Sequence, residues 1–307
     1  MVNLQKNNQN KIHYLILAHK DFNQVKLLVN RLKTENSEIY LHIDGKVKDF
    51  PIFKDVTMIK NRVSVNWWWF TQIKTEVTWI KQIYENMKEW DHLVIISWQC
   101  LPIQKIKKVE KYINDLGNVS CIPYIEADDW IKSRVTKYHY NDTDFKIWFI
   151  NQILTKLINI IWINTKDIRI PIVNLIFDKI TSIFLPKRKY LLKYKIYKWS
   201  NRIVLSYKHV KRAINFLKSD EGKLFYNSFK MSSCADELFF QTMLLNSPVN
   251  NEIKNKSLWY IRWENWHWPF VLTKNDYEKI KQSGKLFARK FDINEDWEIV
   301  RLLEKDN

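Results

Sequence analysis

Ile12-His-Tyr-Leu-Ile-Leu-Ala-His-Lys20 is the stretch that predicts the fold most directly. Its apolar run at residues 14–18 predicts a buried strand. A helix is predicted directly after it by apolar residues at helical spacing, namely Val25, Leu27, Leu28 and Leu32. The same pattern continues along the chain, with strands predicted over 39–43, 56–59 and 92–97 and helices over 71–87 and 103–116.

Strands that alternate with helices indicate an α/β protein in which a sheet is flanked by helices. With 307 residues, the chain is long enough for one large domain or two small ones. It contains no Gly-x-Gly-x-x-Gly and no Gly-x-x-x-x-Gly-Lys segment, so the glycine-rich loops of dinucleotide-binding and P-loop proteins are excluded.

Two segments near the end of the chain carry residues suited to chemistry. Ser233-Cys-Ala-Asp-Glu-Leu-Phe-Phe-Gln241 places carboxylates at the start of an apolar helix. Gly284-Lys-Leu-Phe-Ala-Arg-Lys-Phe-Asp292 places two adjacent cations on a predicted short strand. A carboxylate can accept a proton, and cations can stabilise a departing phosphate group.

Together these segments resemble the Core-2/I-branching glycosyltransferases, which include β-1,6-N-acetylglucosaminyltransferases and peptide xylosyltransferases. Four earlier segments fit the family in the same order: Ile12 to Lys20, Ile39-Tyr-Leu-His-Ile-Asp44, Val65-Asn-Trp-Trp-Trp-Phe-Thr71 and Val94-Ile-Ile-Ser-Trp-Gln-Cys-Leu-Pro102. The resemblance implies a GT-A-type fold in one domain over residues 12–303. It also implies an inverting transfer from a UDP-sugar, carrying N-acetylglucosamine or xylose, to a hydroxyl of a glycan.

The family's Asp-Glu pair falls on Asp236 and Glu237, so the resemblance implies that Glu237 is the catalytic base. An inverting transfer needs one carboxylate to take the proton from the attacking hydroxyl. Without the family match, the simpler interpretation is that both acidic residues favour a helix N-terminus through its dipole.

Basic side chains are implied to stabilise the diphosphate without a metal ion or other cofactor. Lys290 matches the lysine of the family's Phe-Ala-x-Lys-Phe motif, with Arg289 beside it, and Arg262 is our choice for a further cation. Because side chains alternate along a strand, we expect only one of Arg289 and Lys290 to reach the phosphate. The Asp-x-Asp segment at residues 142–144 is better explained as a polar turn, and the acidic pair at 128–129 as a solvated loop.

The nucleotide is expected outside the carboxyl ends of the strands, as in other open α/β sheets. Ala18 and His19 end the first strand, and Asp44 ends the second, where the family has a carboxylate near uracil or ribose. His42 is expected in the core.

Acceptor recognition in the family uses a glutamate followed by basic residues, which Glu126, Trp130 and Arg134 match in kind and approximate spacing. Gln99 falls in the segment that corresponds to Ser-Gly-Gln-Asp in the family, and we predict that it also contacts the acceptor. A surface ion pair of little energetic value is nearly as good an explanation of Glu126 and Arg134.

The net charge of +17 indicates an anionic partner or surface. Residues 145–198 mix apolar and basic residues without a run of about 18 apolar residues, so they do not predict a membrane span. They form either a basic amphipathic surface for anionic lipid or a helical insertion with a solvated basic face, and both interpretations stay open. The alternative function is non-catalytic binding of polyanions or glycans. The sequence contains no nucleic-acid-binding motif, so we expect no nucleic-acid partner.

The N-terminal tail, residues 1–11, is polar, and neither a signal peptide nor an anchor is expected there. The cysteines are Cys100, Cys121 and Cys234, an odd number without paired spacing, which favours a reduced, cytosolic setting without structural zinc. Since animal relatives carry an anchor and many cysteines, we expect a cytoplasmic, bacterial-type enzyme. It would act on a surface polysaccharide or a lipid-linked saccharide, with peripheral contact to the inner face of the membrane if the insertion binds lipid.

Glycine is rare and tryptophan is abundant. Average usage predicts about 21 glycines, whereas the chain has 4, together with 15 tryptophans. Several tryptophans stand where the family pattern or a turn favours glycine: Trp68, Trp69, Trp98, Trp199, Trp266 and Trp268. We hypothesise that some of these codons are read as glycine in the native host, because a few bacteria reassign the UGA stop codon to glycine.

Peptide mass spectrometry of the native protein tests this hypothesis. We expect the mass of glycine at positions 68, 69 and 98, and the mass of tryptophan at all of them would refute the idea.

Overall fold

The computed structural model describes residues 10–66, 69–139, 188–264 and 268–305. Most of the insertion predicted over residues 145–198, and the acidic turn at 142–144, lie outside the described residues. Residues 188–198, at the end of that insertion, form a 3₁₀ turn at Tyr190–Lys193 and a short strand at Tyr197–Lys198.

A mixed seven-stranded sheet forms the centre of the molecule, in the order β10-β6-β9-β4-β1-β2-β3. Strands β3, β2, β1 and β4 are parallel to their neighbours, whereas β9 runs antiparallel to both β4 and β6. The strands of this sheet are β1 Ile12–Ala18, β2 Ser37–Ile43, β3 Thr57–Met58, β4 His92–Ser97, β6 Ser120–Cys121, β9 Val204–Ser206 and β10 Ile253–Lys254. Its flanking helices complete the mixed α/β architecture of a GT-A-like glycosyltransferase fold.

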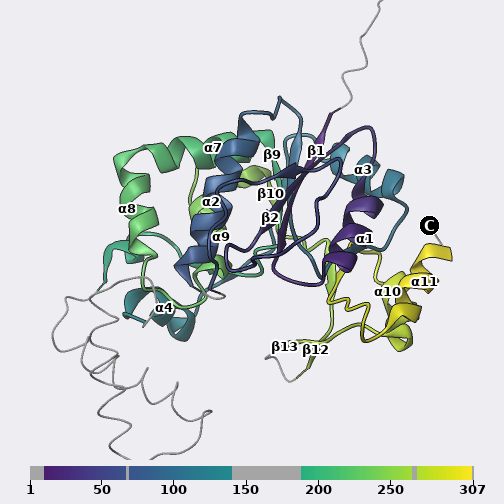
Figure 1. The fold of residues 1–307 in the computed structure, drawn as a ribbon. Coiled ribbons are helices and arrows are strands. Elements are labelled where there is room, and N and C mark those ends of the chain that lie inside the picture. The colour runs from purple at the N-terminus through teal and green to yellow at the C-terminus, as the bar shows by residue number, and fades with distance from the viewer. Residues whose placement is uncertain (1–9, 67–68, 140–187, 265–267, 306–307) are drawn as a thin grey trace, which may run out of the picture.

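Helices cover both faces of the sheet (Figure 1). One face packs against α1 Phe22–Leu32, α3 Ile106–Asn114, α10 Tyr277–Gln282 and α11 Trp297–Lys305. The other face packs against α2 Phe70–Tyr84, α4 Asp129–Thr136, α7 Tyr207–Lys218, α8 Asp220–Ser228 and α9 Phe239–Leu245.

The central strands bury side chains on both faces, which explains their continuous apolar runs. In β1, Tyr14 and Ile16 point to the layer of α1 and α3, while Leu15 points to the layer of α2 and α7. The same alternation holds in β4, where Val94 and Leu93 belong to opposite layers. This period of two fixes the register of each strand, because a shift by one residue would exchange the two layers.

Three small sheets add to the central one. They are formed by β11 Trp259–Ile261, β14 Phe287–Arg289 and β5 Leu101–Pro102, by β12 Trp263–Glu264 and β13 Trp268–Pro269, and by β7 Ile125–Glu126 and β8 Tyr197–Lys198. Strand β14 matters most for function, because it lies between β5 and β11 and ends at Arg289.

The predicted strands and helices agree with the structure, with small shifts at their ends. The strand predicted over 92–97 has those bounds, and the helix predicted over 71–87 spans Phe70–Tyr84. The start of the helix predicted over 103–116 is wrong, because the helix begins at Ile106. The chain just before it, at residues 101–102, is extended and pairs with β14. Within the described part of the chain, no helix has both the length and the apolar character needed to cross a membrane.

Candidate functional site

A cavity of about 620 Å³ opens where β1, β2 and β4 end. This is the edge at which open α/β sheets bind ligands, and the volume lies in the usual range for small-molecule sites. The residues from the sheet and the segments that directly follow its strands are Leu17, Ala18, His19, Lys20, His42, Asp44, Lys46, Val47, Ile95, Ile96, Ser97, Trp98 and Gln99. Further lining comes from Val65, Gln72, Thr75, Asn201, Arg202, Arg289 and Lys290.

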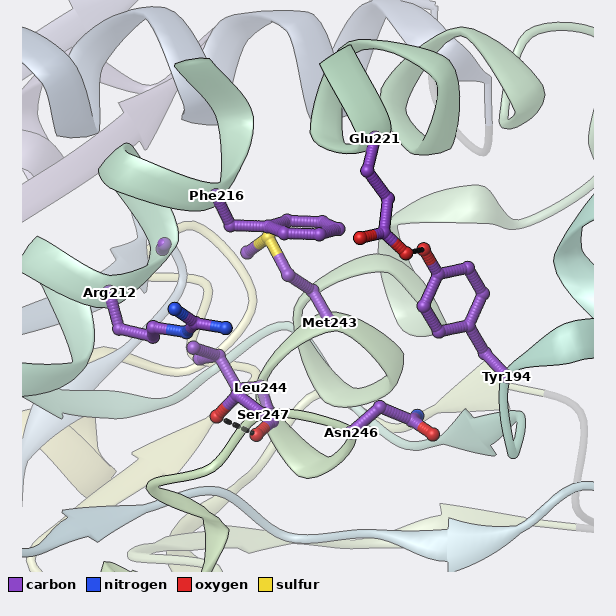
Figure 2. A pocket seen from close by; sticks show the side chains of 9 residues that line it. Tyr194, Arg212, Phe216, Glu221, Met243, Leu244, Asn246 and Ser247 are labelled. Atoms are coloured by element: carbon purple, nitrogen blue, oxygen red, sulfur yellow. Dashed lines mark hydrogen bonds between the residues drawn. The ribbon is translucent and has the colours of Figure 1, made fainter. Parts of the chain in front are cut away.

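A second cavity, between α7, α8 and α9, is much smaller, at about 110 Å³ (Figure 2). Its polar side chains largely bond to nearby protein groups: the Tyr194 hydroxyl donates to Glu221 at 2.6 Å, and the Ser247 hydroxyl donates to the Leu244 carbonyl at 2.7 Å. A space of this size is too small for a sugar nucleotide. The larger cavity is therefore the candidate active site.

The residues predicted for the nucleotide meet at one end of this cavity. Backbone pairing joins the ends of two strands there, since the Asp44 amide donates to the Ala18 carbonyl at 2.8 Å. The Asp44 carboxylate accepts from the Lys46 amide at 2.8 Å and is largely buried. His19 lies at the exposed rim. Asp44 is thus held in a fixed position from which it can accept hydrogen bonds from a ligand.

His42 has a mixed environment. It is buried, as expected for a core residue, and it also belongs to the cavity wall. Its Nε2 accepts from the Val63 amide at 3.2 Å, and burial lowers the pKa of the imidazole to about 4. His42 is therefore neutral at physiological pH and is fixed by the backbone.

Trp98 forms part of the cavity wall and is 3% exposed. Its ring meets the edge of His19 at a centroid distance of 5.5 Å, and the Lys20 ammonium lies 5.3 Å from its centroid. Backbone φ angles are negative at Trp69 and outside the left-handed region at Trp98 and Trp199, so backbone conformation does not require glycine at these positions. Trp68 and Trp266 lie outside the described residues. The remaining argument for glycine is space, because at position 98 it would enlarge the cavity.

Four cations, Lys20, Arg202, Arg289 and Lys290, line the same cavity. The charges of Arg289, Arg202 and Lys20 all act on Lys290. Burial, followed by these charges, lowers the pKa of the Lys290 ammonium to about 8. Burial and the charge of Arg202 also lower the pKa of Arg289, which is 4% exposed and whose Nε has no hydrogen-bond partner among the described residues. Cations that destabilise one another's charge in this way create a site for an anion.

Arg289 and Lys290 both belong to the cavity wall. Strand alternation therefore does not separate them, while the expectation that only one of them reaches the phosphate stays a prediction. Alternation does not apply here, because β14 ends at Arg289 and Lys290 lies beyond it. The Phe291 amide then donates to the carbonyl of Gln99 at 2.9 Å, which connects this segment to the end of β4.

Arg262 is not among the residues of the cavity wall. Its guanidinium forms an ion pair with the buried Asp276 and lies over the ring of Phe270, 4.6 Å from the centroid. The Phe270 amide donates to the Arg262 carbonyl, and the Lys290 amide donates to the Phe270 carbonyl. The backbones of Arg262 and Lys290 are thus connected through hydrogen bonds to Phe270, while the guanidinium of Arg262 pairs with Asp276.

Glu237 ends a 3₁₀ turn, Ala235–Glu237, just before α9. Its carboxylate accepts from Arg134 at 3.0 Å, lies 3.6 Å from the Lys198 ammonium and is 33% exposed. The Trp199 amide donates to the Glu237 carbonyl at 2.9 Å, and Arg202, three residues further on, reaches the cavity. Glu237 is therefore joined through its backbone to the segment that carries Arg202, and its carboxylate is partly open to solvent with two cations around it.

Asp236 has the opposite environment, although it is the adjacent residue. It is 5% exposed, and burial followed by the charge of Glu237 raises its pKa to about 7. Of these two adjacent carboxyls, Glu237 is thus the one that is partly exposed to solvent.

Two of the predicted acceptor residues are linked to Glu237, Arg134 directly and Trp130 through Arg134. Arg134 contacts it directly and lies over the ring of Trp130, 4.4 Å from the centroid, and Trp130 is 67% exposed. Glu126 pairs with Lys195 at 2.8 Å, and both side chains are about half exposed. Gln99 does not join this group, since it belongs to the wall of the large cavity.

Sequence reasoning missed several cavity residues, above all Arg202, Lys20, Lys46, Asn201, Gln72 and Thr75. Arg202 has the clearest signal in the sequence, because it lies three residues after Trp199, one of the positions where the family pattern favours glycine. The others come from α2 and from loops, where no local pattern marks them. Among the described residues, no cluster of three or more His, Cys, Asp or Glu side chains could hold a metal ion.

Comparison with known proteins gives one match and one negative result. The model of the family described as "Branch: Core-2/I-Branching enzyme" matches residues 12–283. The matched range contains Glu237 and Arg202 and ends before Lys290. No curated protein matches the chain.

Proposed function

The chain belongs to the Core-2/I-branching enzyme family, and we propose that it moves a sugar from a UDP-sugar to a hydroxyl of an acceptor glycan with inversion. The family consists of glycosyltransferases, so a role in sugar transfer follows from membership. The nature of the donor, the acceptor and the stereochemistry are our proposal.

The observation that carries the proposal is a group of cations in the wall of the large cavity, whose wall also contains the fixed carboxylate of Asp44. Lys290, Arg289 and Arg202 would bind the diphosphate of the donor, since charge-assisted hydrogen bonds to phosphate are among the strongest in proteins. Asp44 would accept hydrogen bonds from the uridine. The cavity wall thus offers both cations for a diphosphate and a carboxylate acceptor for a nucleoside.

In the proposed reaction, Glu237 takes the proton of the acceptor hydroxyl while the oxygen of that hydroxyl forms a bond to the anomeric carbon. The bond between that carbon and the β-phosphate oxygen breaks, and UDP leaves with the electron pair. Lys290, Arg289 and Arg202 stabilise the negative charge that develops on this oxygen. A single displacement of this kind inverts the anomeric configuration.

Trp130 and Arg134 would contact the acceptor, because both adjoin Glu237 and Trp130 presents its ring to solvent. We propose N-acetylglucosamine or xylose as the transferred sugar and a bacterial surface polysaccharide or lipid-linked saccharide as the acceptor. The protein would act at the cytoplasmic face, where UDP-sugars are made.

Calorimetric titration with UDP, UDP-N-acetylglucosamine and UDP-xylose tests this function. We expect binding that EDTA does not weaken, and tighter binding of UDP than of uridine, because cations provide the diphosphate contacts. If heparin binds and UDP does not, the chain is a polyanion-binding protein and the proposal is wrong.

A further inference from the structure

A chain of hydrogen bonds connects the interior of α2 to the cation cluster. The carboxyl Oε1 of Glu76 accepts from the side-chain Nδ2 of Asn201 at 2.8 Å. The side-chain Oδ1 of Asn201 accepts from the guanidinium Nη1 of Arg202, also at 2.8 Å. Arg202 and Asn201 both belong to the wall of the large cavity, and Glu76 and Asn201 are 0% and 4% exposed.

The burial of the Glu76 carboxyl lowers the stability of the protein unless other interactions compensate for it. A carboxyl in the protein interior costs free energy unless it is neutralised or fully hydrogen-bonded, and the Oε2 of Glu76 has no hydrogen-bond partner among the described residues. Packing between α2 and the sheet would be served equally well by an apolar side chain. A local role for the carboxyl, exerted through Asn201, accounts for its position.

Arg202 needs such support because of its neighbours. Its charge lowers the pKa of both Arg289 and Lys290, so the three cations repel one another when no anion is present. A long arginine side chain with many rotamers would turn away from this repulsion into solvent. The hydrogen bond from Arg202 to Asn201, together with one to the Ser200 hydroxyl at 3.1 Å, holds it at the cavity.

We propose that Glu76 and Asn201 are positioning residues that hold the guanidinium of Arg202 against the diphosphate of the donor. The inference rests on the proposed function, because it assumes that a diphosphate occupies the cavity. The side-chain atoms of Glu76 and Asn201 that form these hydrogen bonds do not have to contact the donor. Their effect is to preorganise one cation, so they set donor affinity through Arg202 alone.

The protonation of Glu76 agrees with this arrangement. Burial, followed by the charge of Asp236, raises the pKa of Glu76 to about 8, while the Asn201 and Gln72 side chains and the charge of Arg202 act in the opposite direction. Glu76 is therefore largely neutral at pH 7. A neutral carboxyl still accepts from Asn201 through its carbonyl oxygen, so glutamine, which has the same shape, can replace it.

A double-mutant cycle on UDP affinity, measured by calorimetry at pH 7, tests the inference. We expect Arg202→Ala to raise the Kd for UDP about 10- to 100-fold, as for loss of a charge-assisted contact, and Asn201→Ala to raise it about 5- to 20-fold. In the Arg202→Ala background, Asn201→Ala should change the Kd less than twofold, because its effect passes through Arg202. Glu76→Gln should leave the Kd within about twofold of wild type, since it keeps the acceptor oxygen.

Asn246→Ala is the matched control. Asn246 is likewise a hydrogen-bonded asparagine, paired with the backbone of Lys195, and it lines the small cavity of Figure 2 and not the large one. It should not change the Kd for UDP. Thermal unfolding of each variant shows whether it is folded, and Asn201→Ser provides a milder change if Asn201→Ala does not fold.

Two results would overturn the inference. One is an equal loss of affinity on Asn201→Ala with and without Arg202, which would show that Asn201 acts independently. The other is unchanged affinity for UDP in the Asn201 variants. If Lys290→Ala still weakens UDP binding in that case, the proposed function remains supported and only the inference is wrong. If the wild-type protein does not bind UDP, the proposed function fails and the inference fails with it.

Discussion

Glu237→Gln is expected to lower kcat for sugar transfer about 10³-fold, in the range measured for loss of a general base. The amide keeps the size of the side chain and cannot accept the proton of the attacking hydroxyl. We propose Glu237 for this role because its carboxylate is partly exposed, whereas Asp236 is buried. Product formation from the UDP-sugar and an acceptor saccharide is the measurement, with donor hydrolysis followed separately.

UDP affinity serves as the internal control for this variant. Since Glu237 does not belong to the wall of the donor cavity, its Kd for UDP should stay within about threefold of wild type, allowing for the weak effect of one partly exposed charge. Glu221→Gln is the matched control variant and should leave kcat unchanged, because Glu221 is also a carboxylate paired with a lysine but lines the small cavity. Transfer at more than a tenth of the wild-type rate by Glu237→Gln would rule out Glu237 as the base.

Lys290→Ala is expected to raise the Kd for UDP about 100-fold at pH 7, the effect of losing a charged hydrogen bond in a partly buried site. It should lower the transfer rate further, because the same charge stabilises the departing diphosphate. Lys290→Arg should retain most of the affinity, since it keeps the charge at that position. Calorimetry with UDP and with uridine separates the diphosphate contacts from those of the nucleoside. Equal affinity of Lys290→Ala and wild type for UDP would remove Lys290 from the site.

The pH dependence of UDP binding follows from the same residue. In the free protein, the pKa of Lys290 is lowered to about 8, so the side chain is charged below that pH and loses its proton above it. A bound diphosphate favours the charged form and raises the pKa again. Affinity should therefore be nearly constant below about pH 7 and fall as the pH rises through 8, with uptake of a proton on binding. In Lys290→Arg this fall should be absent, because arginine stays protonated.

Local patterns in the sequence were sufficient for the central sheet. Residues 92–97 form a strand with the predicted bounds, because a short apolar run buried on both faces has few alternatives. The start of the helix predicted over 103–116 was wrong for a non-local reason. Residues 101–102 pair with β14, almost 190 residues further along the chain, and no local pattern contains that partner.

The catalytic and nucleotide residues were named from motifs, and the structure brings most of them to one region. Ala18, His19 and Asp44 lie at the ends of parallel strands, where the sequence predicted them. Arg262 was chosen from its place in a motif, yet its guanidinium pairs with Asp276. The direction of a long side chain depends on the charges packed around it, and these come from distant segments.

The sequence by itself determined the α/β class, the order of the central strands along the chain and the motif that places a carboxylate before α9. These features depend on periodicity and on residues adjacent in the chain. Only the tertiary structure decided which of two adjacent carboxyls is exposed, that Arg289 and Lys290 face the cavity together, and that Arg202 joins them. Burial and electrostatic repulsion act between residues that are close in space, so these properties were fixed only when the chain folded.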